Sequence, residues 1–191
     1  METQNYDIII IGAGAGGGML ASYLAPSGKK ILVIDRGTWL PREKRNWDVN
    51  AVMVDPVYEN AEQWINKNDD LYHSNAHYNV GGNSKFWGAA LFRLREEDFE
   101  EIRHPDGISP AWPLKYADFE PYYNKVEKLY QVHGLRGEDP TAPPMSEDYP
   151  FPPISHEPRI QEIADALLAD GFHPFHLPTA IRLNEREPNN S

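Results

Sequence analysis

Apolar and polar positions near the start of the chain predict a strand, a helix and a second strand. Residues 6–11 are a run rich in β-branched apolar side chains, which is typical of a strand buried on both faces of a parallel sheet. A glycine-rich turn follows, and we expect a helix over residues 15–25 that ends at residues 26–28. A second apolar run at residues 30–34 predicts the next strand. Strand, helix and strand in this order predict an α/β fold.

Helical spacing of apolar residues predicts which faces are buried. In the first helix, the side chains expected to face the sheet are Met19, Leu20, Tyr23 and Leu24. Residues 116–130 predict a second helix, whose apolar face consists of Phe119, Tyr122, Val126 and Leu129.

A third helix is predicted to begin at Pro158 and to end at Gly171. Its apolar residues recur at helical spacing: Ile160, Ile163, Ala164, Leu167 and Leu168. Before it, residues 137–153 are rich in proline and acids, which favours a linker or an extended arm over a packed element.

The first glycine cluster, residues 12–17, has the spacing of a dinucleotide-binding turn. Gly12 permits the tight turn, Gly14 lets the backbone approach a pyrophosphate, and Gly17 lets the helix lie close to the strand. The N–H groups and dipole at the start of that helix favour an anion. Asp35, about 20 residues further on, can accept hydrogen bonds from ribose hydroxyls and would repel a 2′-phosphate. NADP is therefore disfavoured.

A second glycine cluster, residues 81–88, is not explained by a simple nicotinamide domain. Alone it could be a loop. Its context is more specific: the run 78–95 (YNVGGNSKFWGAALFRLR) is followed by Asp98-Phe99 and then by residues 112–123. Together these motifs resemble the glucose–methanol–choline (GMC) oxidoreductases, most closely the branch of pyranose oxidase and the bacterial sugar-acid and polyol dehydrogenases. The resemblance extends from the first strand to at least Gly134.

The resemblance implies an FAD site built from both clusters. The expected cofactor-binding residues are Gly12, Gly14, Ala15, Gly16, Gly17, Asp35, Arg36, Gly81, Gly82, Asn83, Ser84 and Trp87. Phe86 stands where covalently flavinylated relatives have histidine, so we expect non-covalent FAD. Trp87 stands where the glucose-oxidase type has asparagine, which favours a wall beside the flavin over a catalytic role.

Length and composition narrow the function. The chain has 191 residues, no cysteine and a net charge of −11, which excludes thiolate chemistry and disfavours nucleic acid as a partner. Such a length suits one domain and is short for this family, whose catalytic histidine lies in a C-terminal segment. We therefore expect an N-terminal fragment or one piece of a split flavoprotein, with unidentified catalytic residues beyond Ser191.

The domain prediction is an incomplete Rossmann-like FAD-binding domain with lid segments over residues 1–135. A proline-rich linker or arm follows at 136–157, and the start of a substrate domain at 158–191. The aromatic residues expected to be buried in the lid, rather than to form a sugar-stacking surface, are Trp39, Trp47, Trp64 and Tyr72.

The predicted function is the FAD-binding portion of an oxidoreductase that acts on the CH–OH group of a sugar, polyol or other alcohol. Two alternatives stay open: an NAD-dependent dehydrogenase, and a non-catalytic cofactor-binding subunit that needs a partner chain. The fragment alone is expected to be inactive. His73 and His77 have the i, i+4 spacing of metal ligands but no third ligand, so we expect no metal. No signal peptide or transmembrane run is visible, which predicts a cytoplasmic protein, or a periplasmic one exported with a partner subunit.

Overall fold

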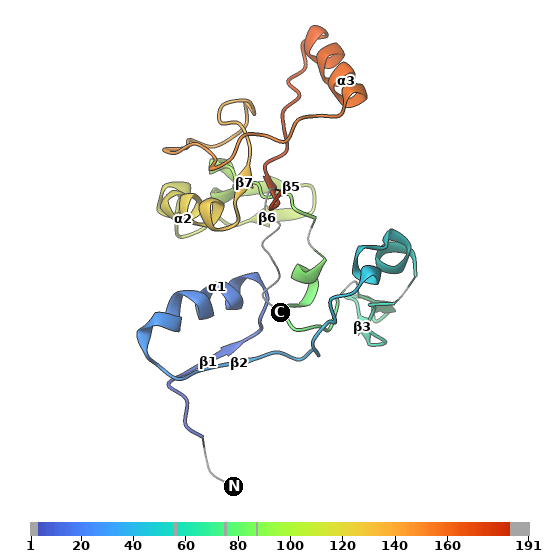
Figure 1. The fold of residues 1–191 in the computed structure, drawn as a ribbon, viewed down its shortest axis with the longest axis vertical. Helices are drawn as coiled ribbons and strands as arrows, with labels where there is room; N and C mark the ends of the chain where they lie inside the picture. The colour runs from blue at the N-terminus through green and yellow to red at the C-terminus, as the bar shows by residue number, and fades with distance from the viewer. Residues whose placement is uncertain (1–3, 56, 75, 87, 184–191) are drawn as a thin grey trace. The chain divides into compact units, whose positions relative to one another are not determined.

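The computed structural model describes residues 4–55, 57–74, 76–86 and 88–183 of the chain. It is a mixed structure of helices and short strands that divides into two compact units, Met1–Gly88 and Ala89–Ser191. Each unit is described by itself (Figure 1). No helix in the described part of the chain is long and apolar enough to cross a membrane.

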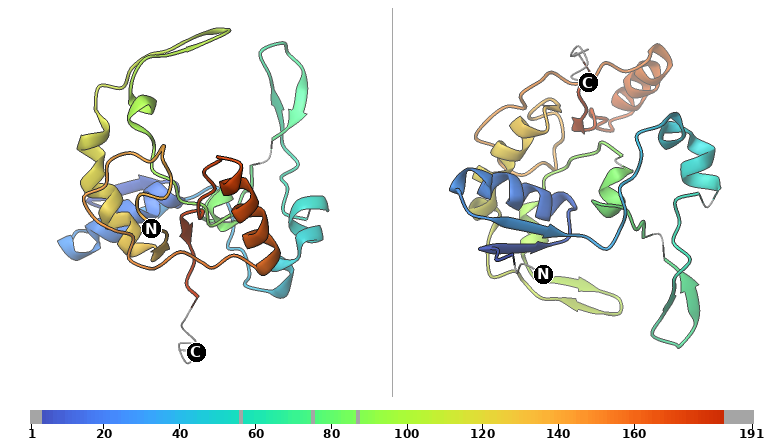
Figure 2. Two further views of the ribbon diagram at one scale, coloured as in Figure 1. Left: turned by 90° about the horizontal axis from the view of Figure 1, so that it is seen from above. Right: turned by 60° about the horizontal axis from the view of Figure 1, so that its bottom comes forward.

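The first unit begins with the predicted strand, helix and strand. Strand β1 (Ile8–Ile11) leads into helix α1 (Ala15–Leu24), and strand β2 (Ile31–Ile34) pairs with β1 in parallel. A short 3-10 turn, η1 (Ala25–Ser27), ends α1, and Gly28 takes a left-handed φ of 71° behind it. The two strands lie side by side with α1 along them (Figure 2). The predicted order of these elements is confirmed.

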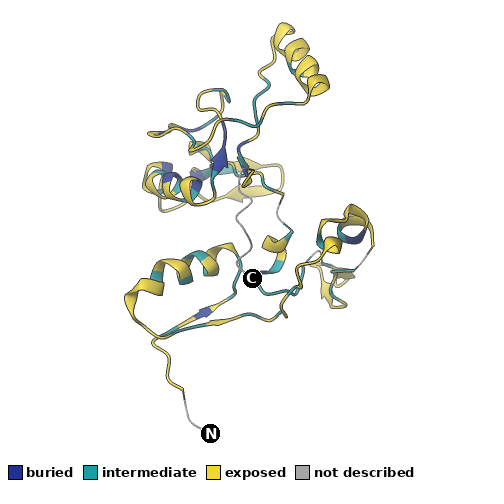
Figure 3. Cartoon of the chain, viewed as in Figure 1, coloured by how far each residue is buried: buried dark blue, intermediate teal, exposed yellow. Residues whose placement is uncertain are grey.

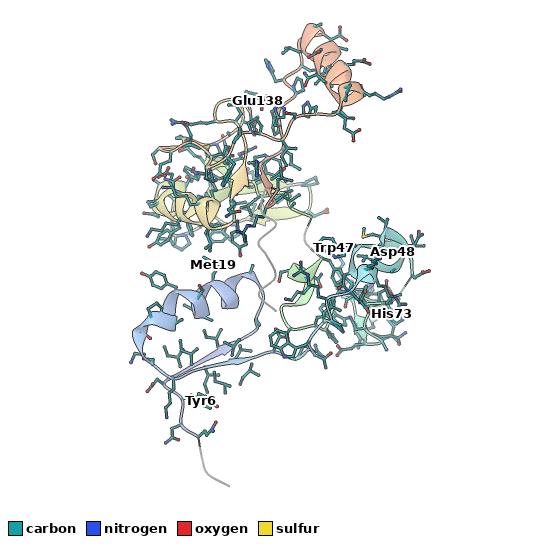
Figure 4. All side chains as sticks on the ribbon, viewed as in Figure 1. Tyr6, Met19, Trp47, Asp48, His73 and Glu138 are labelled. Atoms are coloured by element: carbon teal, nitrogen blue, oxygen red, sulfur yellow. The ribbon has the colours of Figure 1, made fainter. Side chains whose placement is uncertain are left out.

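The predicted sheet-facing side of α1 is wrong for Met19 and Tyr23. Leu20 and Tyr23 are 48% and 81% exposed, and Met19 lies on the side of the helix away from the strands (Figure 4). The cause is Gly17, where a Cβ atom would lie 1.8 Å from the carbonyl oxygen of Gly12. The side of α1 that carries Gly17 therefore faces the strands. Met19 and Tyr23 lie about 200° and 240° around the helix from it, whereas Leu20 and Leu24 lie within about 60° of it.

The rest of the first unit consists of short elements. Two helical turns, η2 (Lys44–Trp47) and η3 (Asn50–Val54), precede an antiparallel hairpin of β3 (Gln63–Ile65) and β4 (Leu71–His73). The carboxylate of Asp48 accepts the N–H groups of Asn50 and Ala51 at 2.9 and 3.1 Å at the start of η3. A 3-10 turn, η4 (Gly82–Lys85), ends this unit's described elements.

The aromatic residues of this region are not buried, contrary to the prediction. Trp39 and Trp47 are each 79% exposed, and Trp64 and Tyr72 pack edge-to-face on one face of the β3–β4 hairpin while staying more than 40% exposed. The elements that carry them are too short to bury such large rings.

The second unit is built around one helix. Its elements are η5 (Glu96–Phe99), β5 (Ile102–His104), β6 (Gly107–Ser109), α2 (Tyr116–Leu129), β7 (Val132–His133), α3 (Pro158–Ala169) and β8 (Thr179–Ala180). β5 pairs with β6 and β7 with β8, both antiparallel. Phe99 and Val132 are 1% and 0% exposed, and buried residues gather on α2 and β7 (Figure 3).

The predicted apolar face of α2 is right for Phe119, whose ring lies 5.2 Å from that of the buried Phe99, and wrong for Tyr122 and Leu129. Tyr122 and Leu129 are 62% and 58% exposed, whereas Asn124 and Glu127 are buried. Both buried side chains bind the guanidinium of Arg93, which comes from the segment before η5. The inward side of α2 therefore combines aromatic packing with polar side chains that bind a buried cation.

The proline-rich segment at 136–157 contacts α2. Met145 is buried, and the N–H and hydroxyl of Ser146 donate to Glu120 at 2.9 and 2.6 Å. Glu138, labelled in Figure 4, accepts the backbone N–H of His176 at 2.9 Å. The divisions at 135 and 157 stay predictions.

Helix α3 follows the prediction in its bounds and its cap. Gly171 has a φ of 85°, and its N–H and that of Phe172 donate to Leu168 and Leu167 in a Schellman arrangement. Its apolar side is open: Ile163 and Leu168 are 49% and 61% exposed.

Candidate functional site: a glycine-lined cavity around Asp35

A cavity of about 490 Å³ lies in the first unit where β1 and β2 end. Both glycine clusters contribute to its wall. The lining residues are Ile11, Gly12, Gly14, Ile34, Asp35, Arg36, His77, Tyr78, Asn79, Gly81 and Gly82. Below, residues 12–17 are called the first glycine turn and residues 77–86 the second glycine loop.

The first glycine turn has the steric properties that its sequence predicts. Gly12 has a φ of 92°, which side-chain-bearing residues rarely adopt, and its N–H donates to the carbonyl of Ile34 at 2.7 Å. Gly14 is the N-cap of α1 and offers no side-chain cap to the first N–H groups of the helix. Those N–H groups and the helix dipole make the start of α1 an anion site.

Asp35 is the centre of the cavity wall. Its Oδ2 accepts the backbone N–H of Ala13 at 2.8 Å and that of Gly81 at 3.1 Å. Its Oδ1 accepts the N–H of Gly37 at 3.2 Å. These N–H groups, that of Ala13 foremost, stabilise the carboxylate and lower the pKa of Asp35 below its ordinary value.

The second glycine loop turns sharply at two adjacent glycines. Gly81 and Gly82 have φ values of 93° and 55°, and the N–H of Gly82 donates to the carbonyl of Asn79 at 2.7 Å. The hydroxyl of Ser84 donates to the carbonyl of Gly81 at 2.5 Å, so it closes the turn. Asn83 Oδ1 accepts the N–H of His77 at 2.7 Å and holds the two ends of the loop together.

Gly37 packs against the second glycine loop, a contact that the sequence did not predict. A Cβ atom at this position would lie 2.4 Å from the carbonyl carbon and oxygen of Tyr78. Thr38 and Asn79 then form a parallel bridge, with the N–H of Val80 donating to the carbonyl of Thr38 at 2.9 Å. The glycine directly after Arg36 is the one sequence feature that could have indicated this close approach to the backbone of Tyr78.

Arg36 lies at one end of the cavity and is already paired. Its guanidinium stacks 3.7 Å from the ring centroid of Tyr78, and its Nη2 donates to Glu62 at 3.1 Å. The hydroxyl of Tyr78 also donates to Glu62, and this bond is the main reason that the pKa of Glu62 is lowered. The cation is therefore held in place over an aromatic ring.

The structure brings together most of the predicted residues. Gly12, Gly14, Asp35, Arg36, Gly81 and Gly82 line the cavity. Ala15, Gly16 and Gly17 form the first turn of α1 beside it, and Asn83 and Ser84 shape the second glycine loop. Trp87 lies outside the described residues.

A smaller cavity of about 290 Å³ adjoins the second glycine loop. Its lining includes Glu59, His77, Asn83 and Phe86. The rings of His77 and Phe86 lie 4.4 Å apart, and His77 Nδ1 lies 2.8 Å from the carbonyl oxygen of Tyr58. His77 is thus engaged with the backbone, and the described residues contain no group of three or more potential metal ligands.

The geometry fits an anionic dinucleotide. Backbone without side chains forms much of the wall, an uncapped helix start supplies N–H donors for a pyrophosphate, and a carboxylate stands at the end of the second strand.

Comparison with known proteins supports the resemblance stated above. No protein-family model matches the chain. It is 28% identical over 179 residues to 6'''-hydroxyparomomycin C oxidase from Streptomyces lividus, covering 92% of this chain and 32% of that protein. It is also 28% identical over 184 residues to paromamine 6'-oxidase from Streptomyces fradiae, covering 94% and 32% respectively.

A third relative is the fructose dehydrogenase large subunit from Gluconobacter japonicus, 27% identical over 166 residues, with 74% of this chain and 30% of that protein covered. A solved FAD-dependent oxidoreductase from Chaetomium thermophilum matches 92% of this chain and 31% of its own at 18% identity, with a TM-score of 0.49. The chain spans about a third of the length of the curated relatives it matches. These relatives are GMC-type oxidoreductases, so the predicted resemblance is confirmed.

Proposed function

We propose that the chain is the FAD-binding portion of a GMC-type oxidoreductase that acts on the CH–OH group of a sugar, polyol or other alcohol. The observation that carries this proposal is the single cavity whose wall contains both glycine clusters and the carboxylate between them. A nicotinamide domain needs only the first cluster, so the second favours the longer flavin dinucleotide.

The chain's own residues divide the work of holding FAD. The N–H groups of Ala15, Gly16 and Gly17 at the start of α1 would face the pyrophosphate, since Gly14 leaves them uncapped. Asp35 would accept the adenosine ribose hydroxyls with the lone pairs that the backbone does not use. When bound, FAD supplies a flavin N5 that accepts a hydride from the substrate carbon.

The strand pair supports the view that further polypeptide completes a Rossmann-like sheet. Ile9 and Ile11 on β1 are 57% and 87% exposed, and Ile34 on β2 is 45% exposed. Strands of this composition are normally covered on both faces. That cover could be a C-terminal part of the same protein or a partner subunit, and it would also bring the missing acid/base residues.

A titration tests the proposal. The purified chain should bind FAD, with a changed flavin spectrum near ~450 nm, and should bind NADH and NADPH much more weakly. Acid precipitation should release all of the flavin, because Phe86 cannot form the covalent bond. A colourless chain that binds NADH would favour the NAD-dependent alternative.

A turnover assay distinguishes part of an oxidoreductase from a non-catalytic cofactor-binding subunit. The FAD-loaded chain should show no turnover with sugars or alcohols, because the proposed acid/base residues lie elsewhere. Activity that appears on mixing with a chain matching the remaining length of the relatives would support the oxidoreductase. Complex formation without activity would favour the cofactor-binding subunit.

A further inference from the structure

We infer that Asp35 is a positioning residue that fastens the second glycine loop to the first glycine turn before any ligand is bound. This role differs from the predicted contact of Asp35 with a ribose, because its partners are backbone groups of the protein.

The evidence is the sharing of one carboxylate oxygen by two distant segments. Oδ2 of Asp35 accepts the N–H of Ala13, 22 residues earlier, and that of Gly81, 46 residues later. The same side chain also holds Gly37 through Oδ1, and Gly37 lies against the backbone of Tyr78. Asp35 therefore binds the second glycine loop directly through Gly81 and supports it again beside Tyr78.

The backbones that Asp35 joins are already in contact. A Cβ atom on Gly81 would lie 3.4 Å from the carbonyl oxygen of Ala13, and one on Gly14 would lie 3.6 Å from that of Gly81. A carboxylate that accepts the N–H groups of Ala13 and Gly81 forms charge-assisted hydrogen bonds, which are stronger than bonds to a neutral acceptor.

The arrangement has a consequence for the cofactor, which rests on the proposed function. The N–H groups of Ala13 and Gly81 are occupied by Asp35, so a pyrophosphate would depend on the N–H groups at the start of α1. Asp35 would thus hold the two glycine segments that form the cavity wall, and the pyrophosphate would bind at the start of α1.

Hydrogen exchange of the whole chain, without FAD, tests the inference. Asp35→Asn is isosteric but removes the charge and keeps only one acceptor oxygen, so every remaining bond is weakened and the amide cannot hold Gly37 together with Ala13 and Gly81. We expect amide exchange to rise by roughly 10-fold or more in residues 12–18 and also in residues 77–86. The matched control is Asp7→Asn, since Asp7 Oδ2 accepts the N–H of Lys30 at 2.8 Å at the other end of the same strand pair. The control should raise exchange near residue 30 and leave 77–86 unchanged.

A pH profile of the unaltered chain gives a second readout that does not depend on how a variant folds. Protection of residues 77–86, corrected for intrinsic exchange, should be complete above pH 3.8 and be lost as the pH falls below that value. Protection is lost toward acid because the pKa of Asp35 is lowered in the folded chain, and protonation of the carboxylate breaks its hydrogen bonds to the backbone N–H groups.

The inference is overturned if residues 77–86 exchange equally in Asp35→Asn and Asp7→Asn, or if their protection does not change between pH 5 and the lowest pH at which the chain stays folded. If Asp35 served the ribose alone, Asp35→Asn would weaken binding of ADP and leave exchange of the ligand-free chain unaltered. Failure of the unaltered chain to bind FAD would contradict the proposed function and leave this exchange result standing.

Discussion

Each of the two units is organised around one charged side chain, but the two centres are built differently. Asp35 is only half-buried and is bound by the backbone N–H groups of Ala13, Gly37 and Gly81. The side chain of Arg93 is 2% exposed, and its guanidinium is bound by other side chains.

The partners of Arg93 come from helix α2. Its Nε and Nη2 donate to the carboxylate of Glu127 at 2.7 and 2.6 Å, its Nη1 donates to the hydroxyl of Tyr116, and its Nη2 also donates to Asn124. Burial opposes the charge, but the carboxylate of Glu127 and the Tyr116 hydroxyl raise the pKa of Arg93. The buried cation Arg93 thus holds a helix against a neighbouring segment through side chains. The carboxylate of Asp35 instead holds the conformation of two glycine loops through their backbone N–H groups.

The largest expected effect is at the buried centre. Glu127→Ala leaves buried Arg93 with Glu120, 3.6 Å from its Nη1, as its remaining carboxylate, and we expect a loss of about 3 kcal/mol in the free energy of unfolding of the second unit. Urea unfolding, followed by hydrogen exchange of residues 116–129, measures it. The double variant Arg93→Met, Glu127→Leu should recover part of the loss, because it removes both charges. Lys125→Ala on the exposed side of α2 should change stability by less than ~0.5 kcal/mol.

The next effect tests the close approach of α1 to β1 in the first unit. Gly17→Ala places a Cβ atom 1.8 Å from the Gly12 carbonyl oxygen, so the helix must move away. We expect a loss of about 3 kcal/mol in stability and weaker FAD binding.

Gly16→Ala is the matched control for that variant. It has no atom within 4 Å of the added Cβ and sits in the same helix. It should gain about 0.5–1 kcal/mol, because alanine favours a helix. Equal losses in both variants would contradict the steric explanation.

A smaller effect is expected in acid at the edge of the second unit. The hydroxyl and N–H of Ser146 stabilise the Glu120 carboxylate and lower its pKa. Folding favours the charged form of Glu120, whose ordinary pKa is 4.5. The contact of residues 140–150 with α2 should therefore be complete above pH 4.5 and be lost as the pH falls below that value. Exchange of this segment between pH 7 and pH 3 tests the prediction. Glu120→Gln should show faster exchange at neutral pH and little further change in acid.

The smallest effect is confined to α3. Gly171 ends the helix with a φ of 85°, and Gly171→Ala should destabilise it by about 1 kcal/mol. Exchange should rise in residues 158–169, with no change in 116–129. A change that extends to α2 would mean that the two helices unfold together.

The sequence predicts well what neighbouring residues decide. β1, α1 and β2 follow from apolar runs and from glycines whose steric roles depend on residues nearby in the chain. Pro158 and Gly171 likewise bound α3, because capping is local.

What the sequence does not predict depends on distant partners. Polar side chains of α2 point inward because they bind Arg93. This residue lies more than 20 positions earlier in the chain, and apolar periodicity cannot reveal such a pairing. Gly81 is bound by a carboxylate 46 residues earlier, and the crowding at Gly37 comes from Tyr78. Trp39 and Trp47 are each 79% exposed, because burying so large a ring needs packed neighbours that the described residues around them do not provide.

The hydrogen bonds of Asp35 to Ala13, Gly37 and Gly81, here called the joint, also limit which amino acids these three positions can hold. Each of its three partners contributes a main-chain amide, a group that every amino acid but proline carries. At 81 and 37 the choice is narrowed by a φ of 93° and by crowding against Tyr78. Position 13 has no positive φ, so its part in the joint requires only a main-chain N–H, which proline alone lacks.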